Sequence, residues 1–135
     1  MIGEYYKEMV LSLPKNSLKK IELLDPPDDI RIEEDLFGWK LSYTKSGRKK
    51  EYFMECRSKD EAFYLKILFD LGMREVYIPK NEEYLKGILP ELERLKARTD
   101  EVLDSYARGL LDPKLRERLK SAVYMEVANV DLPSD

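Results

Sequence analysis

The residue types that could carry out chemistry in this chain are few. It contains no histidine and a single cysteine, Cys56, which excludes histidine-based acid–base catalysis, Ser–His and Cys–His nucleophiles and Cys/His zinc sites. Among the carboxylates and cations that remain, Asp35 and Glu55 could bind Mg²⁺ through oxygen ligands, and Arg57 could stabilise developing charge on a phosphate. The alternative is that Glu55 and Arg57 face solvent from a sheet and pair with neighbouring side chains.

A second set of candidates consists of basic residues that could contact nucleic-acid phosphates, since such contacts require little more than positioned cations. Four of them surround a predicted turn: Lys45, Arg48, Lys49 and Lys50. The others lie toward the C-terminus: Arg108, Lys114, Arg116, Arg118 and Lys120. The alternative is a solvated charged face that offsets the segment 22–35, which holds seven acids and one base.

The element that would position most of these residues is a β-hairpin. Apolar and polar residues alternate over 39–44 and 51–56, on either side of a turn that contains glycine, and this pattern predicts two paired strands. The aromatic residues of the hairpin and Cys56 are expected to pack rather than to bind a ligand. Residues 18–24 fit a strand or a helical turn equally well, and Pro26-Pro27 predicts an extended break.

Helices are expected on both sides of the hairpin. Residues 2–13 carry apolar residues at helical spacing. Ser58-Lys59-Asp60-Glu61 is a capping box, in which the last side chain is expected to reach back to the first amide, and Gly72 is expected to end that helix. The strand that follows, 75–79, would complete a strand–helix–strand crossover that returns to the sheet of the hairpin.

The C-terminal third is predicted to be helical. Pro90 suits the first turn of a helix, so we expect a short helix over 82–88 and a long one over 90–109. Asp112-Pro113 predicts the start of a last helix that pairs with the long one. Apolar residues recur close to every 3.5 residues through 85–106, and such a seam pairs either within a chain or across a dimer interface.

The predicted order of helix, strands, hairpin, helix and strand resembles the core of the PD-(D/E)xK nucleases, which place an acid near the central hairpin and Glu-x-Lys on the next strand. Here Glu55-Cys56-Arg57 takes the place of Glu-x-Lys, with Asp35 upstream. The resemblance implies a metal-dependent nuclease with Asp35, Glu55 and Arg57 as catalytic residues and Mg²⁺ bound by the two acids. Arg57 departs from the usual lysine, and the strand from Trp39 to Thr44 contains no acid. A resemblance of fold does not by itself carry chemistry.

A second resemblance covers about a third of the chain. The residues Glu61-Ala62-Phe63-Tyr64-Leu65-Lys66-Ile67-Leu68, the strand end Ile78-Pro79 and the run Ile88-Leu89-Pro90-Glu91-Leu92-Glu93 resemble the region that follows target recognition in some adenine-specific DNA methyltransferases. The methyltransferase catalytic motifs are absent, so this resemblance implies an accessory piece of a DNA restriction–modification system.

Composition indicates an ordinary domain of 135 residues with a net charge of −3. Charged residues make up 38% of the chain and glutamine is absent, a composition typical of proteins from thermophiles. A single cysteine, the lack of a signal pattern and the lack of any apolar run near the roughly 20 residues of a membrane span favour a cytoplasmic location.

We therefore predict a single α+β domain over 1–135, with a mixed sheet and helix part in 1–79 and C-terminal helices in 80–130. A small, mainly antiparallel sheet with a central β-hairpin, one packed helix and a C-terminal helical pair are expected. The missing proton-transfer groups and glycine-rich phosphate loop favour a non-enzymatic binding or assembly module without a cofactor. Its partner would be a protein, a second copy bound through the C-terminal helices, or nucleic acid, and not a membrane. The Mg²⁺-dependent nuclease is the alternative.

Overall fold

The computed structural model describes residues 2–25, 27–45, 48–108, 112–115 and 118. Its elements confirm the predicted α+β class. Helix α1 (Ile2–Tyr6) continues as a π-helical turn, η1 (Lys7–Leu11), and a short 3₁₀ turn, η2 (Lys15–Ser17), leads into the first strand. The strands are β1 (Leu18–Glu22), β2 (Pro27–Asp35), β3 (Gly38–Lys45), β4 (Glu51–Cys56) and β5 (Glu75–Pro79). The longer helices are α2 (Lys59–Asp70) and α3 (Glu82–Ala107).

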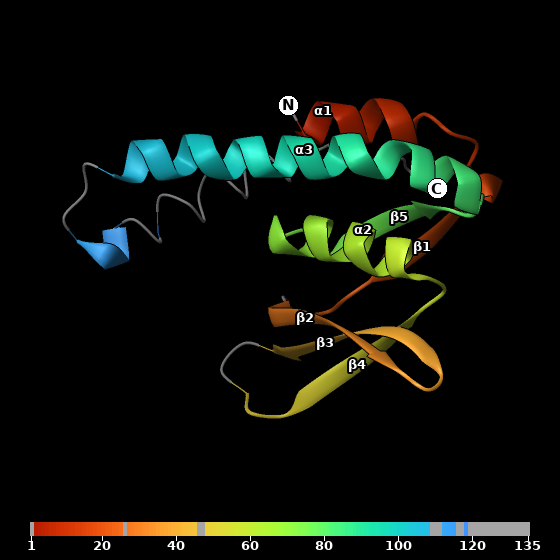
Figure 1. The fold of residues 1–135 in the computed structure, drawn as a ribbon, viewed down its shortest axis with the longest axis horizontal. Coiled ribbons are helices and arrows are strands. Elements are labelled where there is room, and N and C mark those ends of the chain that lie inside the picture. The colour runs from red at the N-terminus through yellow and green to blue at the C-terminus, as the bar shows by residue number, and fades with distance from the viewer. Residues whose placement is uncertain (1, 26, 46–47, 109–111, 116–117, 119–135) are drawn as a thin grey trace.

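The strands form two antiparallel sheets rather than one (Figure 1). The predicted hairpin is β3 and β4, and β2 extends it to three strands. The prediction that 75–79 returns to the sheet of the hairpin was wrong, because β5 pairs with β1, with Lys20 opposite Tyr77. Four of the five residues of β5 are buried, and an apolar strand gains more from a position among packed helices than from the edge of a half-exposed sheet.

Helix α2 begins and ends as its sequence predicts. The Ser58 hydroxyl accepts a hydrogen bond from the Glu61 amide at 3.2 Å. At the other end Gly72 takes a φ of 93°, and the Met73 amide donates to the Leu68 carbonyl at 3.3 Å, as in a Schellman turn. One detail differs, because the Glu61 carboxylate accepts from the Arg57 amide instead of the Ser58 amide.

Helix α3 runs through Pro90 without a break, so the predicted division into two helices was wrong. Leu85 and Leu89 before the proline and Leu92 after it are buried in the same core. Their burial offsets the roughly 3 kcal/mol that a proline costs inside a helix. The predicted last helix falls mostly outside the described residues, although the Lys114 amide donates to Asp112 Oδ1 at 2.9 Å, as at a helix start. No helix in the described ranges has the length and apolar character of a membrane span.

The edge of β5 that faces away from β1 is capped by two tyrosines. The Tyr77 amide donates to the Tyr6 hydroxyl at 3.0 Å, and the Tyr77 carbonyl accepts from the Tyr64 hydroxyl at 2.6 Å. Both tyrosine rings are fully buried, one from α1 and one from α2. Because a buried peptide group without a partner is destabilising, these two hydroxyls allow β5 to lie inside the protein.

We predict that Tyr6→Phe and Tyr64→Phe each lower the free energy of unfolding by about 1–3 kcal/mol, because each leaves one buried peptide group of Tyr77 unpaired. Urea denaturation followed by circular dichroism would measure the change. Tyr84→Phe is the matched control, since it removes an exposed bond of 2.6 Å to the Met9 carbonyl that water can replace. Equal losses in all three variants would contradict the assignment.

Candidate functional site

The two candidate metal ligands lie on opposite sides of β3. Asp35 ends β2 and lies opposite Gly38, whereas Glu55 lies on β4 opposite Lys40. Two interstrand spacings of about 4.8 Å separate their backbones, and the Lys40 ammonium pairs with Asp35 at 3.1 Å. Within the part of the chain that the structure describes, no group of three or more Asp, Glu, Cys or His side chains is placed to bind a metal.

Asp35 has a structural role at its turn. The amide of Phe37 donates to Asp35 Oδ1 at 2.8 Å. That bond, followed by the Lys40 ammonium, holds the pKa of Asp35 below its ordinary value. The carboxylate is therefore ionised at neutral pH and engaged within the chain.

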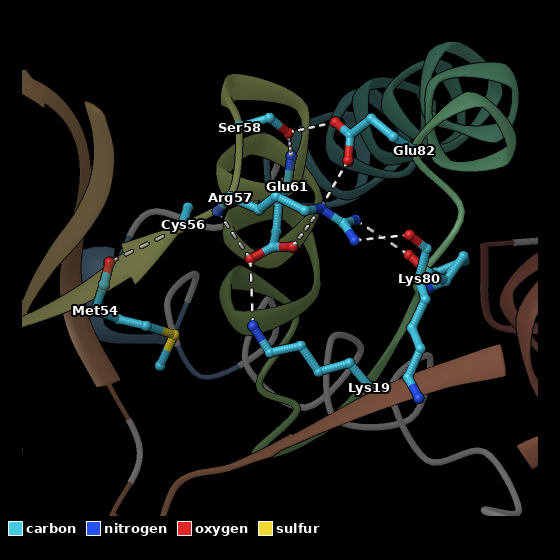
Figure 2. A network of polar contacts seen from close by, with 9 residues as sticks. Lys19, Met54, Cys56, Arg57, Ser58, Glu61, Lys80 and Glu82 are labelled. Atoms are coloured by element: carbon cyan, nitrogen blue, oxygen red, sulfur yellow. Dashed lines mark hydrogen bonds and ion pairs between the residues drawn. The ribbon is translucent and has the colours of Figure 1, made fainter. Parts of the chain in front are cut away.

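Arg57 lies where the ends of β4 and β5 meet the starts of α2 and α3 (Figure 2). This contact region, formed by Arg57, Glu61, Glu82 and the carbonyls of Pro79 and Lys80, is called here the joint. The Arg57 guanidinium donates to the carbonyls of Lys80 at 2.7 Å and Pro79 at 3.2 Å. Its Nε lies 2.7 Å from Glu82 Oε2 and 3.3 Å from Glu61 Oε2. The structure therefore does not bring Arg57 together with the two acids of the nuclease hypothesis, because its charge is directed to other carboxylates.

Glu61 is the fully buried acid of this joint. Its Oε1 accepts from the Arg57 amide at 3.2 Å and lies 3.7 Å from the Lys19 ammonium of β1. Across the joint, Glu82 Oε1 accepts from the Ser58 hydroxyl at 2.5 Å. The second oxygens of Glu61 and Glu82 both face Arg57 Nε, which carries one hydrogen, and neither makes a hydrogen bond of good geometry. The joint thus depends on charge neutralisation by Arg57, which links both sheets and both long helices.

We predict that Arg57→Ala lowers the free energy of unfolding by about 3 kcal/mol, because it leaves the buried Glu61 carboxylate without its main cation. Arg57→Lys should recover part of the loss, since it keeps the charge without the forked donors. Arg31→Ala is the control: its exposed pair with Asp29, at 2.9 Å, should contribute under about 1 kcal/mol. Thermal and urea unfolding would measure the stability of the three variants. If Arg57→Ala lowers the free energy of unfolding no more than Arg31→Ala does, Arg57 does not stabilise this contact region.

Cys56 has the properties of a packing residue. It lies opposite Trp39 in the hairpin and packs against the core, as predicted. Burial first, and then the negative charge of Glu61, raises the pKa of its thiol to about 11. The thiolate is the nucleophilic form of cysteine, so this thiol is neutral and unreactive at physiological pH.

The four bases of the β3–β4 turn lie at one end of the three-stranded sheet. The Lys45 and Lys50 ammonium groups lie 4.4 and 5.4 Å from the centre of the Tyr52 ring. Tyr43 stacks on that ring with a centroid separation of 5.9 Å. The exposed bases of this set are Arg48, Lys49 and Lys50.

Acids beside this turn reduce its positive charge. Asp25 Oδ2 lies 3.9 Å from the Lys45 ammonium, and Glu51 follows the turn directly as the first residue of β4. In the second predicted basic set, Arg108, Lys114 and Arg118 are exposed, and Arg116 and Lys120 lie outside the described residues.

Among the residues that the structure describes, the most exposed large apolar side chains lie at the opposite end of the sheet, on the turn between β2 and β3. Leu36 is 99% exposed and Phe37 is 96% exposed. Asp35 at the first position and Gly38 at the fourth, with a φ of 125°, match the residue preferences of a type I turn. Sequence reasoning missed this pair. The available signal was the occurrence of two large apolar residues at central turn positions, where polar residues are usual.

The apolar seam of α3 is divided between two environments. Its first part, including Leu85, Leu89 and Leu92, is buried in the core of this chain. The predicted pairing with a last helix falls on residues that are mostly outside the described ranges. Further along α3, Val102 is about half exposed and Leu103 is buried. Self-association through the C-terminal helices would therefore have to use residues beyond Leu92.

Comparisons with models of protein families, with curated proteins and with solved structures found no match. A function therefore has to be inferred from the geometry of the described residues.

Proposed function

We propose that this protein is a non-enzymatic binding module that docks on a protein partner through the turn Asp35–Gly38, called here the apolar turn. The observation that carries the proposal is the almost complete exposure of Leu36 and Phe37. Burial of a leucine or phenylalanine side chain is favourable by about 1.5–3 kcal/mol. A partner that covers both would gain that energy, and adjacent exposed apolar groups of this size are typical of interaction sites.

The rigidity of the apolar turn supports the same proposal. Asp35 accepts from the Phe37 amide at 2.8 Å and pairs with the Lys40 ammonium at 3.1 Å. These contacts restrain the backbone of the turn before any partner binds. Because little backbone freedom is then lost on association, more of the burial energy contributes to affinity.

Charge around the apolar turn limits the kind of partner. Glu33 and Glu34 precede it on β2, and Glu55 is exposed on β4. Two bases lie nearby: the Lys40 ammonium is paired with Asp35, and the Lys59 ammonium lies 5.5 Å from the centre of the Trp39 ring. The surface beside the turn is therefore acidic, and its partner is expected to offer an apolar pocket with basic residues on the rim.

We predict that Leu36→Ser/Phe37→Ser weakens binding of the partner about 100-fold or more, since two buried apolar contacts are lost and every 1.4 kcal/mol is tenfold. A photo-crosslinking phenylalanine at position 37 would identify the partner, and calorimetry with the purified partner would give the affinities. The melting temperature should stay unchanged, because neither side chain is buried in the chain. Leu24→Ser, at a side chain 85% exposed, is the matched control and should bind like the parent.

Equal affinity of the double serine variant and the parent would reject the apolar turn as the docking site. Metal-dependent cleavage of DNA or RNA by the parent, abolished by Glu55→Ala, would reject the non-enzymatic proposal in favour of the nuclease alternative. A second copy of this chain as the crosslinked product would show self-association instead.

A second candidate function is weak nucleic-acid binding at the basic turn. The observation that favours it is the set of three exposed cations, Arg48, Lys49 and Lys50, that lie together beside the start of β4 and could contact phosphates. The adjacent Asp25 and Glu51 reduce the local positive charge, so affinity should be low and strongly dependent on salt.

We predict that replacing Arg48, Lys49 and Lys50 with alanine lowers the slope of log affinity against log salt by about 2, at about 0.7 per phosphate contact for single strands. Fluorescence anisotropy with labelled oligothymidylate would measure it. The control Lys86→Ala, at an exposed position on α3, should leave the slope unchanged. Undetectable binding by the parent at low salt would exclude this function.

A further inference from the structure

The two edges of the three-stranded sheet differ in their ability to accept another strand. The edge at β2 begins with Pro27 and has an irregular register between Asp28 and Arg31, where Asp29 takes a φ of 50°. Proline, a bulge and a high density of charge are the features by which edge strands avoid pairing with other chains. The β2 edge is therefore protected.

The edge at β4 lacks the proline and the irregular register of β2, although it also carries acids. Its register with β3 is regular from Glu51 opposite Thr44 to Cys56 opposite Trp39. The strand contains no proline. Among the described residues, no strand pairs with its outer edge. Six consecutive residues thus present a regular backbone to which a further strand could add.

The side chains of β4 make its two faces different. On the face that carries Lys40, the strand presents Glu51, Phe53 and Glu55. Phe53 is 54% exposed, with the Lys40 ammonium 4.5 Å from its ring centre. Glu51 and Glu55 are exposed and have no ion-pair or hydrogen-bond partner among the described residues. Met54 and Tyr52, on the other face, are partly buried.

We propose that the outer edge of β4 binds an extended strand of a partner protein, with basic residues at two positions four apart and apolar residues between them. Main-chain hydrogen bonds would supply affinity, and alternate side chains would supply specificity. The two basic residues lie opposite Glu51 and Glu55, and opposite charges in facing cross-strand positions are stabilising. The apolar residue between them lies opposite Phe53, and its apolar neighbours face Tyr52 and Met54.

A second copy of this chain fits the edge less well than a basic strand. Symmetric pairing of two β4 strands centred on Phe53 would place Glu51 of one copy opposite Glu55 of the other, and like charges in that position are destabilising. Pairing centred on Met54 would place Phe53 opposite Glu55 and leave that acid without a cation. Neither register neutralises both acids, so charge complementarity favours a different partner.

The probe is a fluorescein-labelled peptide containing the sequence Lys-Val-Leu-Val-Lys, titrated with the full chain and followed by anisotropy. Two methylated forms test for strand pairing: one carries N-methyl groups on the two valines, the other on the leucine and lysines. Alternate amides of a strand point to opposite sides. We therefore expect one methylated form to bind like the parent peptide and the other at least tenfold more weakly.

Charge reversal tests the acids of β4. Glu51→Lys/Glu55→Lys should bind the lysine peptide at least tenfold more weakly and should prefer a peptide with glutamates in place of its lysines. Both positions are exposed, and a melting curve would verify that the variant is folded. Leu36→Ser/Phe37→Ser should bind the peptide like the parent, so failure here and failure of the apolar turn are distinguishable.

Equal binding of both methylated peptides would overturn the proposal, because it would show electrostatic attraction without strand pairing. Unchanged preference after charge reversal would overturn it as well. Sedimentation showing that the parent dimerises, and that the double lysine variant is monomeric, would assign the β4 edge to a second copy instead.

Discussion

The constraint on which the rest of the structure depends is the burial of β5 with one edge unpaired by any strand among the described residues. Tyr77 can lie there because hydroxyls from two different helices bind its amide and its carbonyl. Burial raises the pKa of Tyr6 to about 12 and that of Tyr64 well above its ordinary value, so both remain protonated. The two hydrogen bonds fix α1 and α2 relative to β5. The two tyrosine hydroxyls thus bind the backbone groups that a neighbouring strand would bind in a larger sheet.

Arg57 connects this core to the three-stranded sheet. The carbonyls of Pro79, the last residue of β5, and of Lys80, which follows it, accept from the guanidinium, and Glu61 and Glu82 neutralise it. Arg57 follows β4 directly, so the end of that strand is held against the starts of α2 and α3 (Figure 2). One face of the sheet also packs against α2, and Leu41 of β3 is fully buried in the core. The face that carries Phe53, the outer edges and the turns of the sheet remain as surface.

The parts of the fold that could be predicted are those set by short-range chemistry. The Ser58 cap, the Gly72 turn and the β3–β4 hairpin depend on residues a few positions apart, and each is present. The continuity of α3 through Pro90 and the partner of β5 depend on which apolar residues meet across the core. That information lies in contacts between distant segments, where burial outweighs local preference.

The sequence left open whether Asp35, Glu55 and Arg57 come together, for a related reason. Strand pairing in the structure places Asp35 and Glu55 on one face of the sheet, but the direction of Arg57 is decided by carbonyls more than twenty residues away, at Pro79 and Lys80. The same applies to Glu61. The capping box predicts its position on the helix, but it does not predict that the side chain is buried and that Arg57 neutralises its charge. The exposure of Leu36 and Phe37 was missed because apolar residues are ordinarily expected inside.

The acidic segment 22–35 has a structural role that its sequence did not indicate. The sequence suggested that it offsets basic residues elsewhere. In the structure its larger part, Pro27–Asp35, is β2 at one edge of the sheet, where its charges and the irregular backbone at Asp29 oppose pairing. Several of these acids have partners within the chain: Asp35 pairs with Lys40, and Asp29 with Arg31. Glu51 and Glu55, on the opposite edge, have none among the described residues. Because both edges are acidic, net charge cannot distinguish them. The edges differ first in their backbone, which is regular at β4 and irregular at β2. They differ also in their acids, several of which have cation partners at β2, whereas Glu51 and Glu55 of β4 have none among the described residues.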